Sequence, residues 1–293
     1  MKTLVLSSAA AADSTPAAPG SPDSVGSLRQ FLTVLHRCNP VLSGAGWLHV
    51  ALLAGALLLL PFDDRMVTGL NVWFKPLKFA VSDLIYLWTL GWLLAHLPAA
   101  AQRTVRYISW GVAVSMVVEI LVIFLQAARG TTSHFNVGTP LDGILFGVMG
   151  LFIMLNTALL FWALGLMLRH RPVGSTAYVW GMRLGLIVFL AGSAIGGSMI
   201  SHLGHTIGGA DGGAGLPGLG WSTRYGDLRA AHFLGLHALQ VLPLFGWLLT
   251  RYFPHLAVQG QRLGILSFTL LYTSGVAWLY WHALQGLPLW HVS

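Results

Sequence analysis

The chain alternates long apolar segments with short polar links. Seven segments carry few charges over lengths near the 20 residues that a helix needs to cross a bilayer. Because lipid cannot satisfy free backbone N–H and C=O groups, such segments form helices or a closed barrel, and long continuous apolar runs favour helices. We therefore predict an all-α transmembrane helix bundle of about seven spans, a domain that covers residues 44–285. The predicted spans are 44–61, 74–97, 104–128, 140–168, 177–201, 228–251 and 262–285.

Two segments precede the predicted bundle. Residues 1–23 are rich in Ala, Ser and Pro and cannot bury enough apolar surface to order themselves, so we expect a disordered tail. From residue 24 to residue 38 the apolar positions recur at helical spacing behind Ser24, which is placed to cap a helix. This pattern predicts an amphipathic helix over 24–38 that lies at the membrane interface.

One link is much longer than the others. Residues 202–227 are so rich in glycine that we expect no regular element there, while Trp221 argues against a plain linker. Long loops in a compact bundle are often functional. We therefore interpret 202–227 as an outer loop that serves as a lid.

Composition supports a lipid environment and narrows the class of partner. Over 293 residues the mean hydropathy is +0.71 and only 9% of residues are charged, too few for the surface of a soluble protein of this length. The net charge is +7, but the basic residues are scattered at the ends of the apolar segments. We expect the lipid bilayer, together with a small molecule or an ion, as partners, and no nucleic acid.

The distribution of basic residues predicts the orientation of the bundle. Ten of the 16 Lys and Arg residues fall on the amino-terminal side of the predicted spans, and six fall on the opposite side. Because cytoplasmic loops carry the excess of Lys and Arg, we predict a cytoplasmic amino terminus and an external carboxyl terminus.

Ionisable side chains inside the predicted spans are costly in lipid, so each one is a candidate for function. In the second span Lys75 and Lys78 share a helix face that Asp83 adjoins. In the third span Glu119 lies about 15 Å from Arg129 along the helix, near the membrane centre, where a carboxylate must be paired, protonated or hydrated. The structural alternative is that both lysines extend to the headgroups and that Asp83 pairs with one of them.

Spans four and five carry further patterned positions. Asp142, Met149 and Asn156 follow one another at steps of seven, so they share a face that can meet the polar stripes of spans two and three. Span five carries small residues instead, among them Gly192 and Gly197. Small residues of this kind favour close helix packing over chemistry.

Histidine offers a second kind of candidate. Imidazole is a common metal ligand and a proton carrier near neutral pH. We predict a histidine-rich, metal-binding site at the outer face, with hydrogen-bonded structural histidines as the alternative; its ligands would be His202, His205, His232 and His237. His49, in the first span, is interpreted as a lone core histidine.

Haem b is the alternative cofactor, because helix bundles in membranes commonly hold it between axial side chains. His237 lies deep in the sixth span, and Met149 is at a matching depth; His232 with His282 is a second pairing. Basic side chains at the rim would receive the propionates. These are Lys75, Lys78, Arg129 and Arg229.

Three segments resemble a known group of proteins. NVWFKPLKFAVSDLIYLWTLGWLL, QAARGTTSHFN and GDLRAAHFLGLHALQ are similar to segments of bacterial polytopic integral membrane proteins of unassigned function. The resemblance implies a multi-pass protein of the bacterial cytoplasmic (inner) membrane, and it implies no substrate, cofactor or catalytic residue. A ceramidase-like hydrolase is disfavoured because the last span lacks His-x-x-x-His. A rhodopsin is excluded because the same span contains no lysine.

Three hypotheses about function follow. The first is a metal- or haem-dependent redox or hydrolytic enzyme with a polar site in the outer half of the bundle, in which Glu119, Asp83 and His134 are the catalytic residues. The second is a proton-coupled transporter or channel that uses the same stripes as a pathway. The third is a structural or sensory membrane subunit in which the charges pair within the bundle.

Overall fold

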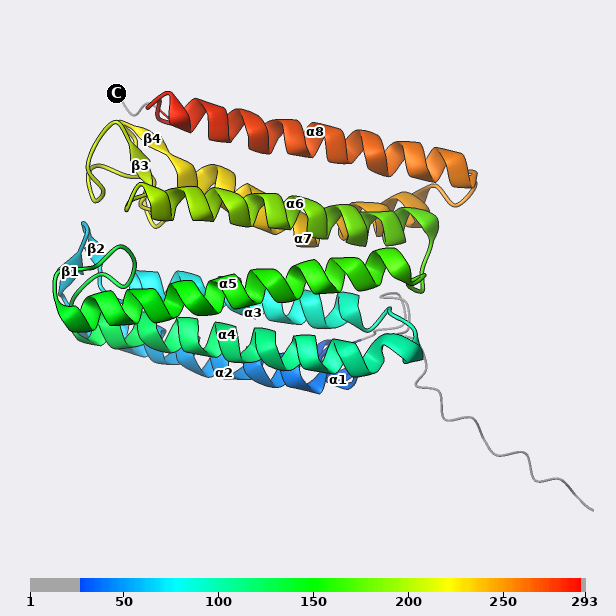
Figure 1. Cartoon of the computed structure of the whole chain (residues 1–293), viewed down its shortest axis with the longest axis horizontal. Coiled ribbons are helices and arrows are strands. Elements are labelled where there is room, and N and C mark those ends of the chain that lie inside the picture. The colour runs from blue at the N-terminus through cyan, green and yellow to red at the C-terminus, as the bar shows by residue number, and fades with distance from the viewer. Residues whose placement is uncertain (1–26, 291–293) are drawn as a thin grey trace, which may run out of the picture.

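The computed structural model describes residues 27–290, which contain eight α-helices (Figure 1). The helices are α1 (Leu28–Cys38), α2 (Pro40–Leu59), α3 (Phe74–Leu94), α4 (Gln102–Ala128), α5 (Pro140–Arg169), α6 (Thr176–Ser201), α7 (Leu228–Tyr252) and α8 (Val258–Leu284). Short 3-10 turns, η2 (Leu60–Phe62) and η3 (Ala99–Ala101), extend α2 and precede α4. The predicted tail at 1–23 and the first three residues of the predicted amphipathic helix lie outside the described residues.

Helices α2 to α8 are long and apolar enough to cross a membrane, which confirms the predicted all-α bundle of seven spans. The first span begins at Pro40, four residues earlier than predicted. The Asn39 side chain accepts a backbone N–H of the first turn, and proline fits the first helical position, so this cap fixes the start of α2. Helix α1 begins behind Ser27, whose side chain caps it, and not behind the predicted Ser24.

The long helices run roughly parallel to one another and form two groups that lie side by side (Figure 1). Helices α2 to α5 make the first group, with α1 packed against α2 and α3, and helices α6 to α8 make the second. The groups meet where α5 contacts α6 and α3 contacts α7. We call the end of the bundle that carries α1 the α1 end, and the opposite end, which carries the short strands, the hairpin end.

Close packing of α6 on α7 depends on glycine. A Cβ atom at Gly192 would lie 2.6 Å from the backbone of Gly235, and one at Gly185 would lie 2.8 Å from the carbonyl oxygen of Ala238. The predicted packing role of small residues in this span is thus confirmed for Gly192. It is wrong for Gly197, around which there is open space.

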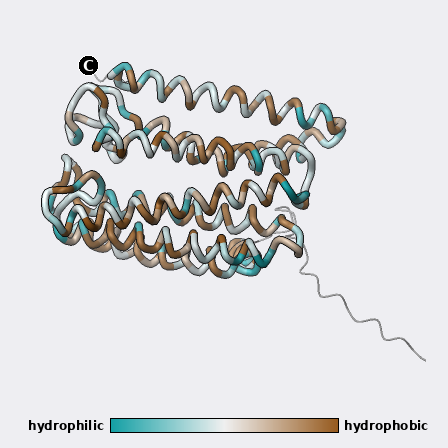
Figure 2. Tube along the Cα trace, in the orientation of Figure 1, coloured by the Kyte–Doolittle hydropathy of each residue, from teal (hydrophilic) through white to brown (hydrophobic). Residues whose placement is uncertain are grey.

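Apolar side chains make up most of the interior of the α1 half of the bundle. Figure 2 shows that hydrophobic residues predominate along the helices, and many large ones are exposed, as a lipid-facing surface requires. The largest buried cluster joins α3, α4, α5 and α6 between the bundle centre and the α1 end. Its fully buried members include Leu87, Leu90, Leu94, Ile108, Val112, Leu160, Met182 and Leu186.

Two short antiparallel ladders close the hairpin end (Figure 1). Strands β1 (Met66–Val67) and β2 (Leu70–Asn71) form one, and β3 (Thr206–Ile207) and β4 (Gly226–Asp227) form the other. The prediction that 202–227 contains no regular element is therefore wrong at both ends of the loop. Glycine permits β4 to lie against the end of α8, because a Cβ on Gly226 would lie 1.9 Å from the carbonyl oxygen of Ala283.

Replacing Gly192 by alanine tests the packing of α6 on α7. The new methyl group would meet the Gly235 backbone, which cannot move aside as a side chain can, so Gly192→Ala should lower stability by about 1–3 kcal/mol. Gly197→Ala on the same helix enters open space and should leave stability unchanged or slightly raised. Thermal unfolding of both variants in one detergent measures the difference, and equal midpoints would contradict the packing argument.

Candidate functional site

Five ionisable side chains follow one another from the bundle centre toward the hairpin end. His49 Nε2 of α2 lies 3.7 Å from Asp83 Oδ2 of α3, and Glu119 Oε1 of α4 lies 3.4 Å from His134 Nε2. The other ring nitrogen of His134, Nδ1, lies 3.2 Å from Lys75 Nζ. The charges of Asp83 and Glu119 also act on each other, which links the two halves. We call His49, Asp83, Glu119, His134 and Lys75 the buried row.

The protonation of His134 follows from its neighbours. A lysine ammonium group only donates, so Lys75 makes Nδ1 of the ring an acceptor. The ring proton then resides on Nε2 and points to the carboxylate of Glu119. Burial, together with the Lys75 charge, holds the pKa of His134 below its ordinary value, although Glu119 acts in the opposite direction. His134 is thus a neutral connector between a cation and a carboxylate.

The pair of His49 and Asp83 requires a proton. His49 Nδ1 lies 2.8 Å from the carbonyl oxygen of Ala45, to which it donates, so Nε2 of a neutral ring carries only a lone pair. That lone pair faces the Asp83 oxygen at 3.7 Å. Two acceptors repel each other at this distance, and the His49 side chain is fully buried. One added proton, on either residue, converts the repulsion into attraction.

Three buried side-chain atoms among residues 27–290 have no hydrogen-bond partner, and all three belong to the buried row. They are His49 Nε2, Asp83 Oδ2 and Glu119 Oε2. An unsatisfied buried polar atom costs about 1–3 kcal/mol. This cost falls on His49 and on the carboxyl groups of Asp83 and Glu119, and protonation would reduce it.

A loop that is held by its own hydrogen bonds brings His134 into the bundle. Gly130 and Phe135 both have positive φ, and the Asn136 side chain donates to Thr131 Oγ1 and to the Thr132 carbonyl oxygen. Asparagine commonly stabilises turns in this way. The loop between α4 and α5 is thereby held so that the imidazole points down toward Glu119 instead of out to solvent.

The predicted stripes on α4 and α5 do meet. Arg129 is 2.6 Å from Asp142, and Gln126 Nε2 donates to the same carboxylate at 2.9 Å. Deeper in the bundle, Asn156 accepts a hydrogen bond from the Tyr86 hydroxyl at 2.8 Å. The prediction of a shared polar face is confirmed. Arg129, predicted as a propionate anchor, is paired with Asp142 in this structure.

The four histidines predicted as metal ligands point to separate partners. His205 pairs with Asp211 at 2.9 Å, while the other three donate to backbone carbonyl oxygens of Ser198, Gly192 and Phe233. Within residues 27–290, no group of three or more His, Cys, Asp or Glu side chains is arranged to hold a metal ion. The metal site predicted at His202, His205, His232 and His237 gains no support.

The proposed haem ligands are also apart. Met149 packs in the core with Val122 and Ile123, whereas His237 is partly exposed on α7 with its ring against Phe233 at 4.0 Å. His232 is held by the Gly192 carbonyl oxygen and fills the space beside Gly196. Among the described residues, the side chains of each predicted axial pair have other neighbours, and the two ring nitrogens of His134 face Lys75 and Glu119. The described residues give the haem hypothesis no support.

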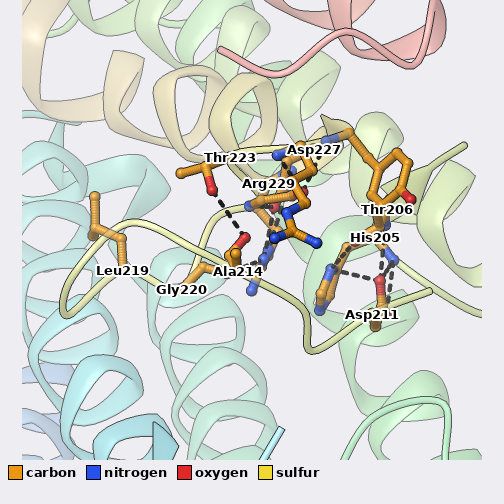
Figure 3. Close-up of polar contacts among 12 residues, drawn as sticks. His205, Thr206, Asp211, Ala214, Leu219, Gly220, Thr223, Asp227 and Arg229 are labelled. Carbon is orange, nitrogen blue, oxygen red and sulfur yellow. Dashed lines mark hydrogen bonds and ion pairs between the residues drawn. The ribbon is translucent and has the colours of Figure 1, made fainter. Parts of the chain in front are cut away.

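Three cationic side chains lie around the end of the buried row that is nearest the hairpin end of the bundle. Lys75 and Lys78 lie in the first turns of α3, and Arg229 lies in the first turn of α7, where it forms a two-pronged ion pair with Asp227. Figure 3 shows Arg229 between the part of the long loop that contains Gly220 and the His205–Asp211 pair. Hydrogen bonds from His205 and Thr206 hold the pKa of Asp211 below its ordinary value against the effect of burial.

Sequence reasoning missed the role of His49 and misplaced the partner of Asp83. Asp83 faces His49, and neither Lys75 nor Lys78 lies within ion-pair distance of it. The available signal was depth: His49 and Asp83 each lie nine residues from the start of their helix, near mid-span. Antiparallel neighbouring helices bring such positions to one level.

The buried row thus joins the catalytic candidates Glu119, Asp83 and His134 with one predicted rim cation, Lys75. The histidines predicted as metal ligands lie outside it.

Comparisons with models of protein families, with curated proteins and with solved structures find no match to this chain. This result agrees with the resemblance drawn from the sequence, which implied no characterised family.

Proposed function

We propose that this protein is a proton-coupled membrane transporter in which Asp83 and Glu119 bind the coupling proton. The observation that carries the proposal is the His49–Asp83 pair, which needs one added proton at the centre of a membrane-spanning bundle. Ionisable residues at this depth commonly mark proton relays and ion pathways. The pair lies inside a bundle of seven helices that are long and apolar enough to cross a membrane, where an unsatisfied charge is costly.

The polar path leads to one end of the bundle. From Asp83, the groups that face the bound proton are Glu119, then His134 and Lys75, toward the hairpin end. Toward the α1 end, the same helices contribute the large apolar cluster around Leu87, Leu90 and Val112. The proton site is therefore reached from the hairpin end and closed by apolar packing from the other.

The two helix groups supply a means of alternating access. The buried row belongs to the first group, while α7 of the second group supplies Arg229 at the mouth. Contacts between the groups come from fewer helix pairs than contacts within them. Rocking of one group against the other is a common way for a transporter to expose a central site alternately to its two sides.

We further propose that the hairpin end faces the outside of a bacterial inner membrane. The excess of Lys and Arg at the α1 end supports this orientation, with the amino terminus in the cytoplasm and the carboxyl terminus outside. A proton moving inward then enters at His134 and reaches Asp83 through Glu119.

A hydrolytic enzyme is the second candidate, and one contact favours it. Ser133 Oγ lies 3.1 Å from His134 Nδ1, and His134 Nε2 faces Glu119, an arrangement of hydroxyl, imidazole and carboxylate. Lys75 competes with the hydroxyl for the same ring nitrogen, which weakens the base. A serine-directed phosphonate that labels the wild type and not Ser133→Ala would favour this function over transport.

Loss of either buried carboxyl should stop proton movement. In liposomes containing phosphate and succinate, an imposed pH gradient should drive proton entry that Glu119→Gln and Asp83→Asn each reduce at least about tenfold, since each removes a proton-binding group from the relay. Asp64→Asn is the matched control, because this exposed carboxyl lies at the same end and outside the row. A wild-type rate equal to that of empty liposomes would contradict the proposal.

Infrared spectroscopy tests the proton on the central pair. At neutral pH the wild-type protein should show either the carboxylic acid band of Asp83 or the imidazolium band of His49, and Asp83→Asn should abolish it, because an amide donates to His49 without an added proton. Asp64→Asn serves again as the control. Spectra that show an ionised carboxylate beside a neutral ring at this pair would refute the assignment.

A further inference from the structure

The rim lysines lack the carboxylate partners that their position calls for. Among residues 27–290, no Asp or Glu oxygen lies within 4.0 Å of Lys75 Nζ or Lys78 Nζ. Lys75 contacts the neutral ring of His134 and lies 5.8 Å from the ring centre of Phe79. Lys78 donates only to a backbone carbonyl oxygen, that of Leu219. Both ammonium groups therefore rely on neutral acceptors at the edge of the membrane.

Neighbouring carbonyl oxygens of the long loop accept hydrogen bonds from Lys78 and Arg229. Leu219 accepts from Lys78 Nζ at 3.0 Å, and the next carbonyl, that of Gly220, accepts from the Arg229 guanidinium at 2.6 Å. Figure 3 shows Leu219 and Gly220 in the stretch of loop beside Arg229. The carbonyl oxygens of two consecutive residues thus bind cations from two different helix groups, a role that the oxygens of a bound anion could take over.

The segment that carries these carbonyls is a compact, internally hydrogen-bonded turn. The Leu216 N–H donates to the Trp221 carbonyl oxygen and the Gly220 N–H donates to that of Leu216, which closes a compact turn. Gly218 and Gly220 have positive φ, a conformation that glycine adopts without strain. On either side of the turn the loop is anchored by Asp211 and Asp227.

Charge balance connects the rim to the buried row. Glu119 supplies one of the two negative charges that act on Lys75, the other being that of Asp211, and the neutral His134 lies between Lys75 and Glu119. When Glu119 accepts a proton, Lys75 loses this compensation, and the positive potential at the rim increases because Lys78 and Arg229 also act on Lys75. An anion that replaces the loop carbonyls would restore the balance.

We propose that Lys75, Lys78 and Arg229 form a binding site for a small oxyanion, a carboxylate or phosphate, and that the oxyanion binds together with a proton on Glu119. This inference rests on the proposed function and names its substrate class. The turn at 216–221 then acts as the lid, whose carbonyl oxygens give way to those of the ligand. By linkage, each ligand raises the affinity for the other.

The other ionisable side chains around Glu119 come from α2, α3 and the loop between α4 and α5. Helix α2 contributes His49, α3 contributes Asp83 and the two lysines, and the loop between α4 and α5 contributes His134. At the rim, Arg229 is paired with Asp227 and His205 with Asp211. The coupling therefore lies between Glu119 and the two lysines, which lack carboxylate partners at ion-pair distance among the described residues.

Equilibrium binding of labelled inorganic phosphate and succinate to protein in phosphatidylcholine nanodiscs tests the site. Wild-type protein should bind at least one of the two probes saturably, and Lys75→Gln or Lys78→Gln should weaken binding about tenfold or more, as expected for loss of a charge-assisted hydrogen bond. Arg224→Gln is the matched control, since it removes one positive charge from the exposed part of the same loop. Saturable binding of neither probe, or equal binding in all three variants, would overturn the proposal.

Two further arms identify the source of the oxyanion and the linked proton. If a lipid headgroup is the natural ligand, phosphatidylglycerol in the nanodisc will compete with phosphate, and the competition will require the two lysines; without competition the ligand is a free anion. Wild-type affinity should rise as pH falls, whereas Glu119→Gln should bind with little pH dependence because it mimics the protonated acid. A strong pH dependence in Glu119→Gln would refute the linkage.

The outcomes separate this inference from the proposed function. Proton entry that needs Glu119 but is unaffected by Lys75→Gln, with neither probe bound, would leave the transporter standing and remove the oxyanion site. Lysine-dependent binding without any proton movement would leave the oxyanion site standing and remove the transporter.

Discussion

Charge in a hydrocarbon interior must be cancelled locally, and the architecture of this protein follows from how it meets that requirement. At the bundle centre, His49 offers Asp83 a lone pair because its other nitrogen is committed to the Ala45 carbonyl oxygen. In this arrangement one added proton, on either residue, satisfies the pair. A site whose stability depends on a mobile ion is suited to binding and releasing it.

The position of the apolar core gives that proton a direction. Ile108, Val112 and Met182 belong to the cluster that fills the α1 half, while the ionisable side chains of the row lie from mid-bundle to the hairpin end. Glycine-mediated packing makes α6 and α7 a tight pair, so that Arg229 moves with the second group. Separation of the groups would therefore alter the rim while leaving the buried row intact, which allows access and proton binding to be controlled separately.

Sequence patterns predicted the bundle well and the site incompletely, for physical reasons. Span number follows from length and hydropathy, and the stripe of Asp142, Met149 and Asn156 follows from helical periodicity. Which histidine joins which carboxylate depends instead on helix neighbours and rotation, which periodicity does not specify. His49 was therefore interpreted as isolated. The histidines near the long loop were overvalued because their number suggested a cluster, whereas three of them are satisfied by backbone carbonyl oxygens.

Neutrality also explains why a cation and a proton-binding acid belong to one relay. With Glu119 ionised, Lys75 and the carboxylate balance across the neutral His134 ring, and the row carries no excess charge there. Adding a proton alone would leave a net positive charge in a region of low dielectric, which is costly. Adding the proton with a singly charged oxyanion leaves the balance unchanged. In the proposed mechanism the site is therefore loaded with both together, and the carbonyl oxygens of Leu219 and Gly220 accept hydrogen bonds from Lys78 and Arg229 until the oxyanion binds.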